Sequence, residues 1–274
     1  MNLSRTIIAL VALWMLLLLG APLAIILAIG LAHSADSVPP YSLGFSLDNL
    51  WTVATDPYYR DALLRSIRVA GISSGLCLLA GFPMAMAIAR SRPRWQNTLL
   101  LAVMLPFWSG FLTRINAWIG LMAEHGLLQQ VLGLPRLLYT ETALYVGITY
   151  TYLPFMVLPL YSRLTRIDPA LAEAAADLGA PPAVVFWRVI LPLAVPGVVA
   201  GLVLVFIPAV GEYVIPSLLG GPNAELVGVV LWDEFSANRD WPMAAAVALW
   251  LLLVLIVIPG GLVRLVKRAS RTPA

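Results

Sequence analysis

The sequence predicts an all-α integral membrane protein with six transmembrane helices. Of its 274 residues, 61% are hydrophobic and 11% are charged, whereas a soluble domain averages about 25% charged residues. The apolar residues gather in six runs: Ile7–Leu31, Ile67–Ala89, Leu99–Met122, Leu144–Tyr161, Val189–Val214 and Met243–Val263. Each run is close to the ~20 residues that a helix needs to cross a ~30 Å hydrocarbon core. Helices are expected because a backbone surrounded by lipid must satisfy its own hydrogen bonds.

The first run has two interpretations, because Arg5 precedes it and small residues follow it. A cleavable signal peptide has an apolar core of ~7–15 residues, and this run is about 25 residues long, so we expect a retained helix. Residues 1–61 would form this helix and an extracytoplasmic loop, in which Asp56-Pro57 starts a turn and a helix from Arg60 onward would lie at the membrane interface before the second span. We expect one membrane core over residues 62–263, without internal repeats, and a basic cytoplasmic tail over 264–274.

The basic residues predict that both termini lie in the cytoplasm, because Arg and Lys near span ends mark that side. With the N-terminus inside, the cytoplasmic set is Arg5, Arg90, Arg92, Arg94, Arg163, Arg166, Arg188, Arg264, Lys267, Arg268 and Arg271. The outer set is smaller: Arg60, Arg65, Arg68, Arg136 and Arg239. The outer loops are rich in Asp and Glu. These acids either attract cations to the mouth of a pathway or simply keep the loops soluble.

Several classes of function are not expected. The formal net charge is +3, but the basic residues form no patch interleaved with aromatics, so no nucleic acid is expected. Cys77 is the single cysteine, and His33 and His125 lie in different loops, which argues against a disulfide or a metal site. The chain has no G-x-x-x-x-G-K-[ST] string to cradle phosphates. We therefore expect no catalytic residue and no cofactor in this chain, and any ATP and Mg²⁺ to be bound by a partner.

The most informative segment is the polar loop over 168–192, which contains EAAADLGAPPAVVFWRVILP. Its first part is a good helix former, and Gly179 followed by Pro181 and Pro182 is a helix stop signal. The sequence predicts a short helix over about Pro169–Gly179, a sharp turn, and a second helix that enters the membrane. A short helix presented in this way is typical of a docking element.

Apart from Arg68 at the start of the second run, two charged residues lie inside the apolar runs, where a charge costs about 2.5–3.5 kcal/mol on insertion scales. Glu212 stands beside Gly211 and Tyr213, and Pro208 and Pro216 are expected to break the helix around it. A carboxylate next to an aromatic ring and free carbonyls would suit an organic ammonium group. Arg114 would pair with Glu212 or Glu124 and lock a closed outer mouth. Alternatively, both side chains lie near the outer interface and simply reach toward water.

Aromatic residues near the outer ends of the spans are further candidates for a substrate pathway. They are Trp108, Trp118 and Trp232, the last followed by Asp233 and Glu234 in the final outer loop. An interfacial aromatic belt would place Trp and Tyr in similar positions. The preceding Gly220-Gly221-Pro222 turn is expected to form a re-entrant tip that touches a delivering protein.

The polar loop resembles the cytoplasmic EAA loop of ABC-importer permeases, E-A-A-x-x-x-G followed after nine residues by I-x-L-P. The matching residues are Glu173, Ala174, Ala175, Gly179, Leu191 and Pro192, and Val189 replaces the isoleucine. Three further stretches, PFWSGFLTRINAW, YTYLPFMVLPLYSRL and the region from FIPAVGEYV to WPMAAAV, are similar to permeases of polyamine ABC importers.

This resemblance implies a type I ABC-importer transmembrane domain in the bacterial inner membrane, importing a putrescine- or spermidine-like polycation by alternating access. It also implies a second, homologous permease, two ATPase subunits coupled through the loop, and a periplasmic polyamine-binding protein. Three alternatives stay open. The same machinery would serve a cationic amino acid, another amine or an inorganic ion. A stand-alone secondary transporter would need inverted repeats, which are not apparent. A membrane enzyme or assembly factor would need a catalytic constellation.

Overall fold

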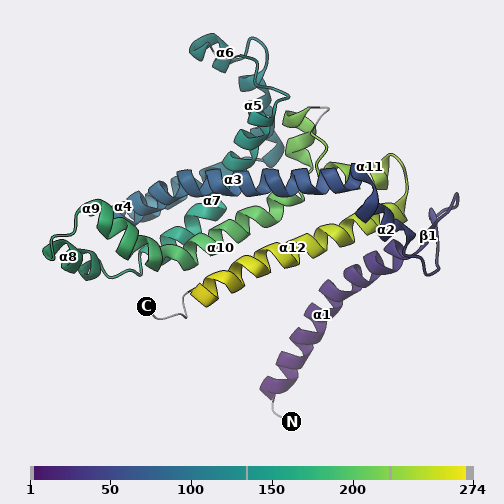
Figure 1. Cartoon of the computed structure of the whole chain (residues 1–274), viewed down its shortest axis with the longest axis horizontal. Coiled ribbons are helices and arrows are strands. Elements are labelled where there is room, and N and C mark those ends of the chain that lie inside the picture. The colour runs from purple at the N-terminus through teal and green to yellow at the C-terminus, as the bar shows by residue number, and fades with distance from the viewer. Residues whose placement is uncertain (1–2, 134, 222–223, 270–274) are drawn as a thin grey trace. The chain divides into compact units, whose positions relative to one another are not determined.

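The protein is predominantly helical in a computed structural model, which describes residues 3–133, 135–221 and 224–269 (Figure 1). Strands β1 (His33–Ser34) and β2 (Tyr41–Ser42) pair in one short antiparallel hairpin. The helices and π-helical turns are α1 (Leu3–Gly30), α2 (Asp48–Thr55), α3 (Pro57–Arg90), α4 (Pro93–Trp108), α5 (Phe111–Met122), α6 (Leu127–Leu132), α7 (Glu141–Leu164), α8 (Pro169–Asp177), α9 (Pro182–Val185), η1 (Phe186–Ile190), α10 (Leu191–Val210), η2 (Pro216–Gly220), α11 (Val227–Ser236) and α12 (Trp241–Ala269). The all-α fold predicted from the sequence is confirmed.

Five helical segments are long and apolar enough to cross a membrane: Ile7–Gly30, Pro57–Arg90, Glu141–Leu164, Pro182–Val210 and Trp241–Val266. The remaining predicted span is not one straight helix, because α4 and α5 meet at an angle of 87°. Ser109 and Gly110 are extended at this break, with ψ of 144° and 141°. Pro106 removes a helix donor one turn earlier, which weakens the end of α4. Which end of each span faces the cytoplasm stays a prediction.

The chain divides into two compact units, and the first comprises Met1–Leu64 and Val227–Leu255. Within it, the segment after α1 packs against the start of α12. The Trp250 indole donates to the Leu50 carbonyl at 3.0 Å, and a Cβ on Gly30 would come within 2.8 Å of Leu249. By contrast, α1 buries none of its most apolar 18-residue window within the described structure.

The second unit, Arg65–Leu226 with Ile256–Ala274, is built around the pair α7 and α10, which lie side by side (Figure 1). Glycines on α10 permit the close approach. A Cβ on Gly201 would lie 2.5 Å from the Met156 sulfur, and one on Gly197 would lie 2.8 Å from the Arg163 Cβ. The core between them contains the fully buried Met156, Leu160 and Val205.

Two helices extend further than the apolar runs indicated. Helix α3 has 34 residues, or about 51 Å at 1.5 Å per residue, which exceeds a ~30 Å hydrocarbon core. It begins at Pro57 and so includes the segment expected to be a separate interfacial helix, whereas α2 is the separate short helix before it. Helix α12 continues into the predicted basic tail as far as Ala269, and residues 270–274 lie outside the described structure.

Candidate functional site

The loop over 168–192 folds as predicted, into a short helix with defined ends. At the start of α8, the Asp168 carboxylate accepts a hydrogen bond from the Ala170 amide at 3.0 Å, and Pro169 occupies the first turn. At its end, Gly179 has φ of +84°, and its amide donates to the Ala176 carbonyl at 2.8 Å. The Ala180 amide donates to the Ala175 carbonyl at 3.1 Å, which completes a Schellman motif. The two caps stop a helix of only nine residues.

Helix α8 lies on the outside of its unit, beyond one end of α7 and α10 (Figure 1). None of its residues is buried, and Glu173 and Ala174 are both exposed. The Leu178 side chain at its C-terminal cap is 89% exposed, and Leu171 is 48% exposed. Apolar side chains held this far into solvent on a capped helix are typical of a surface that another protein covers.

The end of the loop is a π-helical turn rather than a plain helix start. Pro192 has no amide hydrogen, so the Arg188 carbonyl four residues earlier has no helical donor. The chain widens into η1, and the Leu191 amide bonds to the Phe186 carbonyl five residues back. The Arg163 side chain of α7 donates to the Leu193 carbonyl at 2.8 Å, which ties the start of α10 to α7. Leu191 and Pro192 thus mark the junction between the loop and the long helix.

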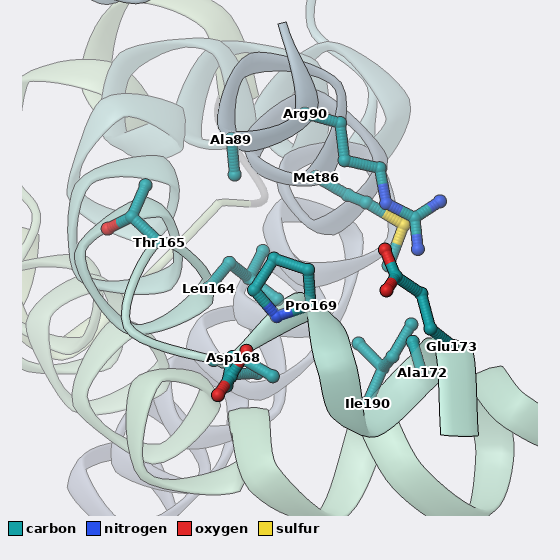
Figure 2. A pocket seen from close by; sticks show the side chains of 11 residues that line it. Met86, Ala89, Arg90, Leu164, Thr165, Asp168, Pro169, Ala172, Glu173 and Ile190 are labelled. Carbon is teal, nitrogen blue, oxygen red and sulfur yellow. The ribbon is translucent and has the colours of Figure 1, made fainter. Parts of the chain in front are cut away.

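A cavity of about 310 Å³ separates α8 from the ends of α3 and α7 (Figure 2). Its lining residues are Met86, Ala89, Arg90, Leu164, Thr165, Ile167, Asp168, Pro169, Ala172, Glu173 and Ile190. Figure 2 shows the Arg90 guanidinium and the Glu173 carboxylate pointing toward each other at its edge. Arg90 and Glu173 do not form an ion pair within 4.0 Å. The ion pairs given by the described residues are Arg60–Asp61, Arg68–Glu141 and Arg136–Glu124.

A second hollow of about 300 Å³ also borders α8 and shares Met86, Arg90, Ala172 and Ile190 with the first. With two unfilled spaces along it, α8 is lightly packed against the rest of its unit. A lightly packed helix can shift without breaking a close-packed core.

Glu212 is buried, with 7% of its surface exposed, and it lies at a break in the helix of the fifth span, as predicted, although the helix ends after Pro208 rather than at it. Helix α10 continues past Pro208 to Val210, and Glu212 follows it in the break before η2. Its Oε1 accepts hydrogen bonds from the Val214 amide at 3.1 Å and the Ile215 amide at 3.3 Å. The Tyr152 hydroxyl of α7 donates to Oε2. The carboxylate therefore caps the next helical segment, and its contacts are three neutral donors.

Arg114 is also buried, with 9% of its surface exposed, in α5. Its guanidinium lies over the Phe107 ring at 5.3 Å and the Phe111 ring at 5.8 Å. Its Nε and Nη1 atoms are buried without a hydrogen-bond partner. The pairing considered from the sequence, with Glu212 or Glu124, does not occur among the described residues, where Glu124 pairs with Arg136 at 3.7 Å.

The aromatic candidates of the second unit occupy different settings. Trp108, at the end of α4, is 84% exposed. Trp118 of α5 packs edge-on against Tyr150 of α7, with ring centroids 5.4 Å apart. Tyr213 follows Glu212 directly, and its carbonyl accepts a hydrogen bond from the Ser217 hydroxyl at 2.7 Å. The turn after it reaches Gly221 with φ of +74°, and Pro222 lies outside the described residues.

Trp232, Asp233 and Glu234 belong to the first unit, where they lie in helix α11 rather than in a loop as predicted. Glu234 is buried, and it accepts hydrogen bonds from the Tyr59 hydroxyl at 2.7 Å and the Asn238 amide at 2.9 Å. These bonds hold the turn between α11 and α12. Trp232 is 45% exposed and contacts Phe235 with ring centroids 6.5 Å apart.

Sequence reasoning missed three partners of these residues: Tyr152 for Glu212, Tyr59 for Glu234 and Arg90 beside Glu173. The hydroxyl of Tyr152 in an apolar run was a usable signal for the first, because a buried hydroxyl needs a hydrogen-bond partner, whereas Tyr59 lies outside the apolar runs. Nothing local in the sequence identifies which carboxylate each hydroxyl meets. Arg90 carried only the signal of a basic residue at a span end.

Comparison with known proteins gives consistent matches over most of the chain. Residues 78–271 match the family described as binding-protein-dependent transport system inner membrane component. The chain is 36% identical over 262 residues to the spermidine/putrescine transport system permease protein PotB of Haemophilus influenzae, covering 93% of this chain and 91% of that protein. It is 36% identical over 266 residues to PotB of Escherichia coli, covering 94% of each. Its fold matches a bacterial ABC transporter involved in alginate import, with a TM-score of 0.73, 18% identity and coverage of 98% and 96%.

Proposed function

Because this chain belongs to the inner membrane components of binding-protein-dependent transport systems, which are multi-pass proteins of the bacterial inner membrane, we propose that it is the permease subunit of an ATP-driven importer for polyamines of the spermidine and putrescine class. Residues Glu173, Ala174, Ala175, Gly179, Leu191 and Pro192 couple it to separate ATPase subunits. The substrate pathway includes Glu212, Tyr213, Arg114, Trp108, Trp118, Trp232, Asp233 and Glu234.

The observation that carries the coupling role is the exposed, doubly capped α8. Its caps at Asp168 and Gly179 fix its length, so it moves as one rigid piece, while the cavities beside it leave room for movement. Leu178 and Leu171 would enter a groove on the ATPase. Movement of α8 then reaches the membrane through η1 into α10, which is tied to α7 by Arg163. This is a rigid-element transition of the hinge and shear type.

ATP and Mg²⁺ would be bound by two partner ATPase subunits, and this chain would perform no chemical step. Its other partners are a second homologous permease and a periplasmic polyamine-binding protein, with both termini of this chain in the cytoplasm. Support for the polyamine class comes from the names of relatives that are 36% identical over nearly the whole chain. Glu212 supports it chemically, because a carboxylate is the side chain that pairs with an ammonium group through charge-assisted hydrogen bonds.

Reconstitution tests the proposal. The chain is purified with its partners, inserted into liposomes, and assayed for uptake of radiolabelled putrescine and spermidine with ATP inside or absent. We expect uptake only with ATP, and competition by unlabelled polyamines but not by arginine. Uptake by the isolated chain without ATP would indicate a secondary transporter. Uptake of another solute alone would contradict the polyamine assignment while keeping the importer.

The docking surface is tested with Leu178→Gln, which should lower the amount of ATPase recovered with the chain. Leu43→Gln is the matched control, because Leu43 is 80% exposed but lies in the loop after β2. We place this loop on the extracytoplasmic side, where the ATPase cannot reach it. Equal ATPase recovery for both variants would contradict docking through α8.

A further inference from the structure

Two side chains of opposite charge, Arg90 and Glu173, face each other at the edge of the cavity beside α8 (Figure 2). They do not form an ion pair in this structure, and both residues are exposed. Arg90 lines both hollows beside α8, whereas Glu173 lines the larger of the two. A movement of α8 into the cavity would bring the two charges into contact.

Arg90 stands on a braced part of the second unit. It is the last residue of α3, and the Gln96 side-chain amide donates to the Ala89 carbonyl at 3.2 Å and to the Ser91 carbonyl at 3.0 Å. The Gln96 side-chain oxygen in turn accepts a hydrogen bond from the Tyr161 hydroxyl of α7 at 3.1 Å. These bonds occupy carbonyls at the end of α3 and tie that end to α4 and α7. The backbone that carries Arg90 is therefore held in place.

Glu173, by contrast, stands on the element that has room to move. It lies in the middle of α8, which has nine residues and buries none of them. The caps at Asp168 and Gly179 keep this helix intact, while the two hollows leave it lightly packed. A shift of α8 would therefore carry Glu173 as part of one rigid piece toward a fixed Arg90.

The walls of the cavity favour such a closure. Met86 of α3, Leu164 of α7 and Ile190 of η1 line it with apolar side chains. Closing the cavity would bring them against Ala172 of α8 and remove apolar surface from water. The charges at the edge would then be partly desolvated, and opposite charges attract each other more strongly there than at an open surface.

We propose that Arg90 is a positioning residue for α8: in the assembled importer α8 closes the cavity, and Glu173 forms an ion pair with Arg90. The inference rests on the proposed function, which makes α8 the element that the ATPase subunits move. The pair gives α8 a second connection to the membrane, into α3, beside the one through η1 into α10. Because the end of α3 is tied to α4 and α7, a force on Arg90 acts on all three helices. Arginine suits this role, since its planar guanidinium binds a carboxylate in a defined geometry.

Charge reversal tests the pair. Putrescine uptake per ATP hydrolysed is measured in liposomes for the native complex, Arg90→Glu, Glu173→Arg and the double variant. Arg94→Glu is the matched control, because it makes the same charge change at an exposed arginine that lines neither hollow. We expect Arg90→Glu to lower the ratio at least fivefold with native ATPase recovery, and the double variant to return to within twofold of the native ratio. A ratio for Arg90→Glu equal to that of Arg94→Glu would overturn the inference, as would a double variant that binds the ATPase but is no better than Arg90→Glu.

A crosslink covers the case in which Glu173→Arg no longer binds the ATPase. Arg90→Cys and Glu173→Cys are combined in a Cys77→Ser background, and membranes that contain all the partners are treated with a short thiol-to-thiol crosslinker. A link between the two cysteines of one chain, identified by mass spectrometry, supports the inference. No more link than the control pair Arg94→Cys and Glu173→Cys gives would overturn it. If the native complex takes up no polyamine with ATP, the proposed function itself fails, which is a separate outcome.

Discussion

Replacing Gly179 with valine tests whether the ending of α8 matters for coupling. Gly179 has φ of +84°, and a Cβ at this position would meet no atom within 4 Å. The substitution therefore introduces backbone strain without a clash. A residue held in a sparsely populated conformation costs about 1–3 kcal/mol, and a β-branched residue belongs at the upper end of that range. The chain escapes the strain by giving up the two hydrogen bonds that close α8 at Ala175 and Ala176.

The size of the effect follows from this strain. Suppose that the capped loop is about 2 kcal/mol lower in free energy than the uncapped loop. The equilibrium constant for docking then falls about 30-fold, because each 1.4 kcal/mol changes an equilibrium constant tenfold. A graded series sharpens the test, because asparagine tolerates positive φ better than alanine, and alanine better than valine. ATPase recovery and polyamine uptake should fall in the order asparagine, alanine, valine.

Gly260→Val is the matched control. Its Cβ would also meet nothing within 4 Å, and Gly260 lies inside α12 without positive φ. Membrane insertion of both variants is checked by immunoblot. Native ATPase recovery and native uptake for Gly179→Val would refute the argument that the ending of α8 controls coupling.

Three further outcomes are expected. Tyr152→Phe removes one hydrogen-bond donor from Glu212 and should lower uptake about tenfold with assembly intact, because an unsatisfied buried acceptor costs about 1–3 kcal/mol. The control Tyr150→Phe should leave uptake unchanged. Glu212→Gln keeps the hydrogen-bonding shape but removes the charge, so a tenfold or larger loss of uptake is expected; unchanged uptake would leave Glu212 as a helix cap alone. Two cysteine variants in a Cys77→Ser background test the orientation. Val38→Cys replaces a residue that is 90% exposed and should react with a membrane-impermeant thiol reagent, whereas Leu178→Cys should react only with a permeant one. The reverse pattern would invert the predicted orientation.

The sequence was sufficient for five of the spans and for α8, because both depend on local signals. An apolar run of about 20 residues directly indicates a helix that crosses the lipid. Gly179 followed by Pro181 is a local signal that ends a helix. The bend between α4 and α5 was missed although Pro106, Ser109 and Gly110 stand in the sequence, because the apolar run continues across them.

The surroundings of Glu212 could not be predicted in the same way. Pro208 was expected to break the fifth span, but α10 continues through it to Val210. A proline inside a helix removes one donor, and neighbouring helices in a bundle can compensate for that loss. The partner of the Glu212 carboxylate, Tyr152, is 60 residues away, and only the packing of α7 on α10 brings the two together. Contacts of this kind are set by tertiary structure and leave no periodic signal.

The two buried charges of the second unit have opposite consequences for a polycation. Glu212 accepts hydrogen bonds from the Tyr152 hydroxyl and two backbone amides, and a carboxylate is the group that an ammonium would pair with at this break. Arg114 has two buried guanidinium nitrogens without a hydrogen-bond partner among the described residues, and its positive charge opposes the approach of an ammonium group.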